Sequence, residues 1–307
     1  MFTLIPANAV FGLLAALFWG GGDFSGGMAV KRAGGSVLGA LRIILISHSA
    51  SLCILLIVAL MRGDSFPHGA PLFWGISTGI IGGLSATGFY IALARGAMGA
   101  AAAISGLLAA AIPSLVTIVA EGSPGALHLL GFVIAGIAIW MVAAAPTGVL
   151  EDPTLKPDTS TTLLAVISGA GFGAYFVALK MAGVAGVAWP LATARMGSIT
   201  TCTLCVFILT MMNRRAIRGG VPGGGPAVVI SRSTLLWALS TAVLDTSGNL
   251  FFVSATRAGR LDLAAVLASL YPATTILLAG LILKEHFSKR QGIGMAIAAV
   301  AVVMITL

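Results

Sequence analysis

Two stretches of this chain carry the same pattern of residues. Leu72-Phe73-Trp74 followed by Ser77-Thr78 returns in the second half as Leu235-Leu236-Trp237 followed by Ser240-Thr241. Each half also holds about five long apolar segments. Because five is odd, a chain whose segments all cross a membrane enters its second half from the opposite side. The repeat therefore predicts an all-α membrane protein with ten transmembrane helices in two inverted five-helix repeats.

The composition supports a membrane environment and excludes a water-soluble core. Hydrophobic residues make up 58% of the chain, charged residues only 8%, and the mean hydropathy is +1.07. A soluble protein carries roughly 25% charged residues. The net charge of +8 comes from cations scattered between apolar runs, as in loops beside anionic lipid head groups. This scatter favours the lipid bilayer, and not nucleic acid, as a partner of the chain.

Apolar runs of about 20 residues, which suffice to cross the ~30 Å hydrocarbon layer, place the helices. The first repeat is predicted over residues 1–147 and the second over 161–307. A polar stretch that contains Pro153 and Pro157 is predicted as the linker, over 148–160. The predicted helices cover residues 10–30, 37–60, 71–94, 99–120, 127–145, 161–182, 188–211, 233–256, 262–283 and 291–307.

Two glycine clusters lie at corresponding places in the first and sixth predicted helices. Glycine lowers the cost of a change in backbone conformation, and glycine-interrupted segments in both halves are typical of transporter binding sites. The clusters are therefore predicted to interrupt these helices and to act as hinges. Close approach of helix backbones in lipid is the alternative explanation. The predicted hinge residues are Gly20, Gly21, Gly22, Gly169, Gly171 and Gly173.

Two acidic residues lie near the middle of predicted helices, where a charge costs on the order of 3 kcal/mol. Asp245 shares a helix face with Thr241 and Asn249, and no cation lies within one turn of it. Asp23 lies one turn after Trp19. Such faces belong beside a wet cavity, although hydrogen bonds to a neighbouring helix would also explain them. The residues predicted to bind substrate are Trp19, Asp23, Tyr90, Tyr175, Asp245, Asn249 and Tyr271.

Three further residues inside the same segments are candidate charge or proton partners. Arg42 and Arg195 occupy corresponding positions in the two repeats, each about 10 Å into its helix. Either arginine could hold a substrate carboxylate, pair with an aspartate, or extend to the membrane surface. His48 lies among three serines, so it is a candidate proton carrier or a histidine bonded to neighbouring hydroxyls.

Short motifs near the C-terminus resemble a known family. Ser269-Leu270-Tyr271-Pro272, Leu283-Lys284-Glu285-His286-Phe287 and Gly292-Ile293-Gly294 resemble the EamA-type repeat of the drug/metabolite transporter superfamily. Phe18-Trp19-Gly20 and the arginines Arg42 and Arg195 are also similar to that family. The first repeat departs from the pattern, because Pro113 lies closer to Glu121 than Pro272 lies to Glu285.

The resemblance implies ten helices, an inverted two-fold arrangement and transport of small organic solutes, with the YddG-like amino-acid exporters as the nearest group. It also implies that both termini are cytoplasmic. The positive-inside rule predicts the reverse orientation, because most Lys and Arg residues lie in odd-numbered loops. Loop charge and family resemblance therefore disagree on the orientation.

The predicted function is a secondary transporter that exports small organic metabolites, amino acids first among them, by alternating access at the repeat interface. Sugars, nucleosides and drugs are alternative substrates. A membrane-embedded enzyme and a channel are the alternatives from other classes, but the sequence contains no HExxH, no GxSxG and no repeated filter ring. No catalytic residue, metal or cofactor is expected. We expect a protein of the bacterial cytoplasmic membrane that acts as a monomer on a small-molecule substrate.

Overall fold

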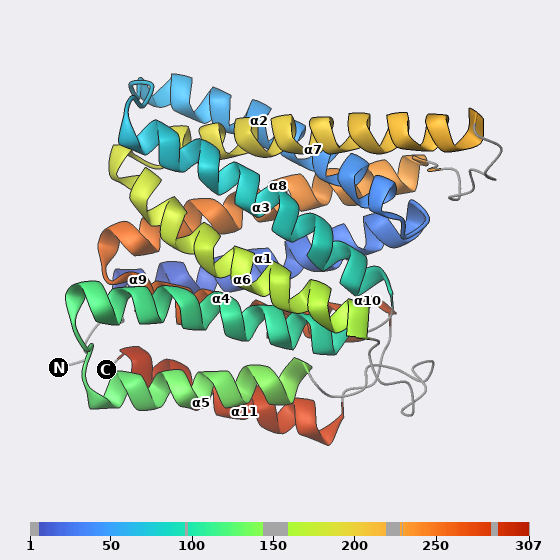
Figure 1. Cartoon of the computed structure of the whole chain (residues 1–307). Helices are drawn as coiled ribbons and strands as arrows, with labels where there is room; N and C mark the ends of the chain where they lie inside the picture. Colours follow the sequence, from blue (N-terminus) through green and yellow to red (C-terminus); the bar gives the residue numbers. More distant parts are fainter. Residues whose placement is uncertain are drawn as a thin grey trace.

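The computed structural model describes residues 6–95, 98–143, 159–218, 228, 230–283 and 288–306. Within these residues the secondary structure is helical, without strands. The helices form an elongated bundle, and α1 begins at the same end of the bundle at which α11 finishes (Figure 1). Their bounds are α1 Ala7–Arg32, α2 Val37–Arg62, α3 Ala70–Ala94, α4 Met98–Glu121, α5 Ala126–Ala143, α6 Thr159–Ala182, the 3₁₀ turn η1 Gly183–Ala185, α7 Ala188–Arg218, α8 Arg232–Ala258, α9 Leu261–Ala268, α10 Tyr271–Leu283 and α11 Lys289–Thr306.

Most of these helices are suited to a lipid environment. Among the described residues, seven spans are long and apolar enough to cross a membrane, and α5 and α11 provide shorter apolar helices. α8 has 27 residues but is not one of the seven, because polar residues such as Thr241, Asp245 and Asn249 lower its hydropathy. The chain is therefore an all-α integral membrane protein, as its composition predicts.

The predicted spans correspond to observed helices, and their ends differ by a few residues except in α7, which continues to Arg218. The ninth span departs from the prediction, because it consists of two helices, α9 and α10, separated by Ser269 and Leu270. Pro272 follows this break as the second residue of α10, where a missing N–H costs little. Most of the predicted linker, 148–160, lies outside the described residues, so the repeat boundary stays a prediction.

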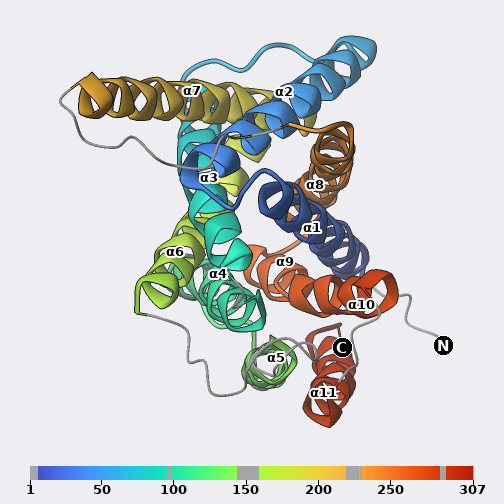
Figure 2. The same cartoon turned by 90° about the vertical axis from the view of Figure 1, so that its right-hand side faces the viewer.

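The contacts between helices are pseudo-symmetric: most contacts that a helix of the first half makes have a counterpart made by the corresponding helix of the second half. α1 packs against α8 as α6 packs against α3, and α4 packs against α6 as α9 and α10 pack against α1. The pairs α2–α7, α5–α11 and α4–α9 contain one partner from each half. Figure 2 shows α2 and α7 together on one side of the bundle and α5 with α11 on the opposite side. The two halves therefore interlock along the whole bundle.

Two names describe the ends of the bundle. The terminal end is the one at which α1 begins and α11 finishes, and the linker end is the one at which α5 finishes and α6 begins (Figure 1). α1 runs from the terminal end to the linker end, and α6 runs in the opposite direction. This reversal is the inverted arrangement that an odd number of spans per repeat requires.

The prediction that glycines interrupt the first and sixth helices is wrong. α1 and α6 run without a break through Gly20–Gly22 and Gly169–Gly173. A Cβ added at Gly20 would lie 2.5 Å from the Tyr271 carbonyl oxygen. These glycines therefore serve close helix packing, which lipid favours between small residues. The hinge role of Gly20, Gly21, Gly22, Gly169, Gly171 and Gly173 stays a prediction, and the observed break lies in the ninth span.

Candidate functional site

A cavity lies among residues from the middle of helices of both halves. Two of the three candidate charge partners, His48 and Arg195, line it, whereas Arg42 is not among the lining residues. The seven residues predicted to bind substrate all line this cavity: Trp19, Asp23, Tyr90, Tyr175, Asp245, Asn249 and Tyr271. The structure thus brings together seven predicted residues that the sequence places on five different helices.

Arg195 of α7 is the centre of a polar network beside the cavity. Its Nη2 forms an ion pair with Asp245, and its Nε donates to Ser51 Oγ at 2.8 Å. Its Nη1 lies 3.1 Å from His48 Nε2. The side chain of Arg195 is only 6% exposed, against 24% for Asp245. Arg195 therefore neutralises Asp245 across the α7–α8 contact. This is the pairing with an aspartate that was one of the roles considered for this arginine, and the cation comes from another helix, since none lies within one turn of Asp245 on α8.

Both ring nitrogens of His48 have hydrogen-bond partners. Its Nδ1 lies 2.6 Å from Ser198 Oγ, and its Nε2 faces the Arg195 guanidinium, which is a donor only. The arrangement fits a neutral imidazole that accepts from Arg195 and donates to Ser198. His48 thus fixes the position of the Arg195 side chain.

A second chain of hydrogen bonds links α6 to α8. The Tyr175 hydroxyl donates to Asn249 Oδ1, and Asn249 Nδ2 donates to the Asp245 carbonyl oxygen at 2.7 Å. On the other side of the cavity, the Tyr271 hydroxyl lies 2.9 Å from Ser105 Oγ. Most polar groups of the cavity wall are therefore already bonded to one another.

Aromatic rings, together with glycines and alanines, form the rest of the wall. Trp19 stacks on Phe176 with ring centroids 5.0 Å apart, and Phe176 packs on Phe252 at 4.5 Å. Three larger lining side chains, Phe172, Phe176 and Ser198, were not predicted, and neither were the glycines and alanines of the wall. Ser198 follows Arg195 by one helical turn, and the two phenylalanines are one turn apart in α6, so their spacing could have found them.

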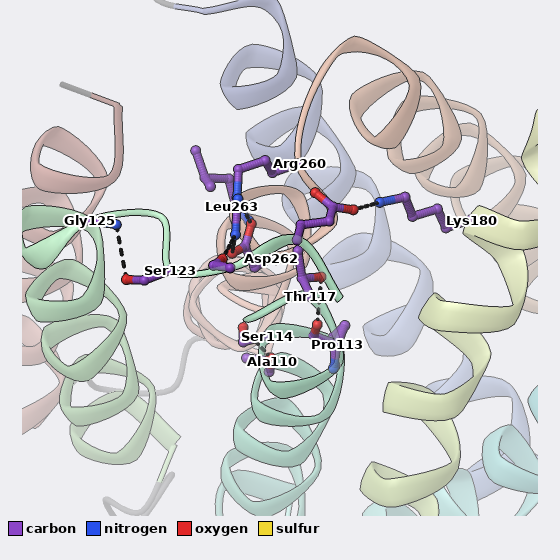
Figure 3. Close-up of polar contacts among 12 residues, drawn as sticks. Ala110, Pro113, Ser114, Thr117, Ser123, Gly125, Lys180, Arg260, Asp262 and Leu263 are labelled. Carbon is purple, nitrogen blue, oxygen red and sulfur yellow. Dashed lines mark hydrogen bonds and ion pairs between the residues drawn. The ribbon is translucent and has the colours of Figure 1, made fainter. Parts of the chain in front are cut away.

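A separate charged cluster joins the halves at the terminal end (Figure 3). Lys180 of α6 donates to Glu121, the last residue of α4, at 2.6 Å. Arg260, between α8 and α9, donates to the Gly122 carbonyl oxygen at 2.8 Å and forms an ion pair with Asp262 at the same distance. Its hydrogen bonds to Asp262 raise the pKa of the Arg260 guanidinium above its ordinary value. We call this cluster the terminal-end latch, because it ties the end of α4 to two segments of the other half.

Reversing one charge of the terminal-end latch is expected to ease opening of this end. The side chains of Lys180 and Glu121 are 30% and 40% exposed, so their pair contributes at most about 1 kcal/mol. Glu121→Lys or Lys180→Glu should therefore speed labelling of a cysteine placed at Ala109, in the cavity, by up to about fivefold. The labelling uses a membrane-impermeant reagent on the terminal side, in a background free of native cysteines. The double charge swap should restore the slow rate, and equal rates in all variants would contradict the latch.

Comparisons with known proteins agree with this fold. Residues 159–307 match the model of the EamA-like transporter family. No curated protein sequence matches the chain significantly. Among solved structures 21 chains match, and one of them, described as "Crystal structure of protein", covers 97% of this chain and 96% of its own length with a TM-score of 0.72 and 16% identity. That similarity concerns the fold alone. Residues 159–307 therefore form an EamA-like transporter family domain.

Proposed function

We propose that the protein is a secondary transporter that exports small organic solutes by alternating access between its two halves. Amino acids are the first candidates, as in the YddG-like exporters, and the bacterial cytoplasmic membrane is the proposed location. The observation that carries the proposal is a mid-bundle cavity lined by residues of both halves. In inverted-repeat transporters the substrate site lies at this interface.

The chemistry of the cavity supports a solute that carries an amino group. Asp23 and Asp245 supply two carboxylates and Arg195 supplies one guanidinium. Tyrosine hydroxyls and aromatic faces complete the wall, which suits a compact amphipathic molecule. Sugars, nucleosides and drugs are the alternatives within the same class of function. A membrane-embedded enzyme or a channel is the alternative from another class.

Flux measurements on the purified full chain in proteoliposomes test this proposal. Transport predicts saturable uptake that is accelerated by unlabelled solute on the opposite side of the membrane. Protein-free liposomes are the control. Flux without saturation or counterflow would identify a channel, and a chemically altered solute would identify an enzyme.

The proposed orientation places both termini in the cytoplasm, so the linker end faces outward. Ser160 lies at the linker end, where its hydroxyl accepts a hydrogen bond from Arg95 at 2.8 Å, and it is exposed. A cysteine at Ser160 should therefore react with a membrane-impermeant reagent in intact cells. Protection in intact cells, with labelling only after lysis, would show the reverse orientation that the loop charges predict.

A further inference from the structure

We propose that Asp23 binds the protonated amine of the cargo, whereas Asp245 serves as the counter-ion that holds Arg195. This inference rests on the transport function proposed above and assigns its substrate class. It makes the cavity selective for solutes with a protonated amine, whether or not they also carry a carboxylate.

The polar groups of the cavity divide into bonded and unbonded sets. Asp245, Arg195 and Asn249 all have partners within the protein. In the part of the chain that the structure describes, Asp23 makes no hydrogen bond or ion pair, and the Tyr90 hydroxyl makes no hydrogen bond. The cavity therefore offers one free carboxylate and one free hydroxyl to an incoming solute.

The two free groups lie close together. Asp23 and Gly26 are three residues apart on α1, so they share a helix face. A Cβ added at Gly26 would lie 2.8 Å from the Tyr90 hydroxyl oxygen. The Tyr90 hydroxyl is therefore placed within one helical turn of Asp23. An ammonium group has three N–H donors, so it can donate to the Asp23 carboxylate and to the Tyr90 hydroxyl oxygen at once.

The charge balance of the cavity also favours a cation. Gly22 packs against the backbone of Asp245, with its added Cβ at 3.3 Å from the Asp245 nitrogen, so Asp23, the next residue of α1, lies near Asp245 at the α1–α8 contact. Arg195 provides one positive charge and Asp245 uses it. A second carboxyl group in a poorly hydrated cavity carries its negative charge only beside a positive partner. A cationic cargo supplies that partner.

Two observations define which cation fits. Among the described residues, no group of three or more His, Cys, Asp and Glu side chains is placed to hold a metal ion. Trp19, one turn before Asp23, and Tyr90 instead place aromatic rings on the cavity wall, and aromatic faces attract ammonium groups. An organic amine therefore fits the site better than a metal ion.

The cavity has little to offer to a cargo carboxylate. The Arg195 side chain is 6% exposed, and each of its three nitrogens already faces a protein partner. Both functional groups of the Asn249 amide are bonded. The cavity can thus accept a cargo that carries a carboxylate but does not require one. A cargo whose amine has lost its charge, by contrast, loses its main contact, the one with Asp23.

Three ligands built on one side chain test the inference. They are phenylalanine, its amide, which is a monocation, and its N-acetyl derivative, which is an anion. Their binding to the purified full chain is measured by the concentration dependence of thermal stabilisation, which does not depend on flux. We expect phenylalanine and the amide to bind at least tenfold more tightly than the N-acetyl derivative. Asp23→Asn should weaken the binding of both amines at least tenfold. Asp64→Asn should change the binding of neither, because Asp64 is a half-buried acid in the α2–α3 connection, paired with Arg62 and outside the cavity.

The possible contrary results are distinct. Tight binding of the N-acetyl derivative, unchanged binding of amines by Asp23→Asn, or no binding of any of the three ligands would overturn the amine assignment. If Asp23→Asn does not fold, Asp23→Glu replaces it and should keep the order of the three ligands. Saturable counterflow of a solute without an amine would leave the transport function standing and refute Asp23 as the selective residue. Amine binding without flux of any solute would refute the transport function and leave the binding site intact.

Discussion

Asp245→Asn is expected to lower transport at least tenfold, a loss equivalent to about 1.4 kcal/mol. The substitution keeps the shape of the side chain and removes the charge that neutralises Arg195. Arg195 is then left buried with a positive charge beside the cavity, which repels a cationic cargo. Removing one partner of a buried ion pair destabilises a protein by roughly 3–5 kcal/mol. For Asp245→Asn we expect a loss at the lower end of this range, because asparagine has the same shape as aspartate. Counterflow should therefore fall at least tenfold, and the melting temperature should fall with it.

The double variant Asp245→Asn/Arg195→Gln separates the two roles that Asp245 could have. It removes both charges of the pair, so the folding stability should recover relative to the single variant. If Asp245 is only the counter-ion of Arg195, amine binding recovers as well, because Asp23 is untouched. A stable double variant that binds no amine would show that Asp245 itself contacts the cargo. Wild-type flux in Asp245→Asn would show that the ion pair has only a structural role.

Much of this fold could be predicted from the sequence because a lipid bilayer permits few backbone conformations. Spans of about 20 apolar residues must be helical in a bilayer, since every backbone N–H and C=O needs a partner within its own helix. The repeated Leu-x-Trp pattern then places those spans in two related halves. The polar residues of α1 and α8 were predicted to face a cavity because a charge in the hydrocarbon region needs water or a partner. The structure places Asp23 and Asp245 there.

The contacts between helices could not be predicted in the same way. The ion pair of Arg195 with Asp245 depends on the rotation and height of α7 relative to α8, and neither quantity is encoded in a hydropathy pattern. The break between α9 and α10 was missed because Ser269 and Leu270 are buried and a single serine in an apolar run does not mark a helix end. The glycines of α1 were assigned to an interruption because a close approach and a flexible point need the same small residue. Only the neighbouring atoms distinguish these two uses.

Gly79→Ala is expected to destabilise the protein by about 3 kcal/mol and to abolish transport. Gly79 of α3 packs on the backbone of α7, where an added Cβ would overlap the Ala194 carbonyl oxygen and lie 2.8 Å from the Ser198 nitrogen. Backbone atoms inside a helix cannot turn aside as a side chain does, so the cost lies at the upper end of the 1–3 kcal/mol typical of overpacking. Thermal unfolding of the purified protein and counterflow in proteoliposomes measure the two effects.

Gly21→Ala is the matched control, since it adds the same methyl group to a cavity-bearing helix. The nearest atom to its Cβ is Leu244 Cδ1 at 3.3 Å, the end of a flexible side chain. Alanine also favours a helix over glycine by about 1 kcal/mol, so this variant should be at least as stable as the wild type. The contrast matters because α7 carries Arg195: if Gly79 sets the distance between α3 and α7, it also sets the position of the guanidinium beside the cavity. Equal stability of the two variants would show that α7 can shift without cost, and the network around Arg195 would then be less rigid than its hydrogen bonds imply.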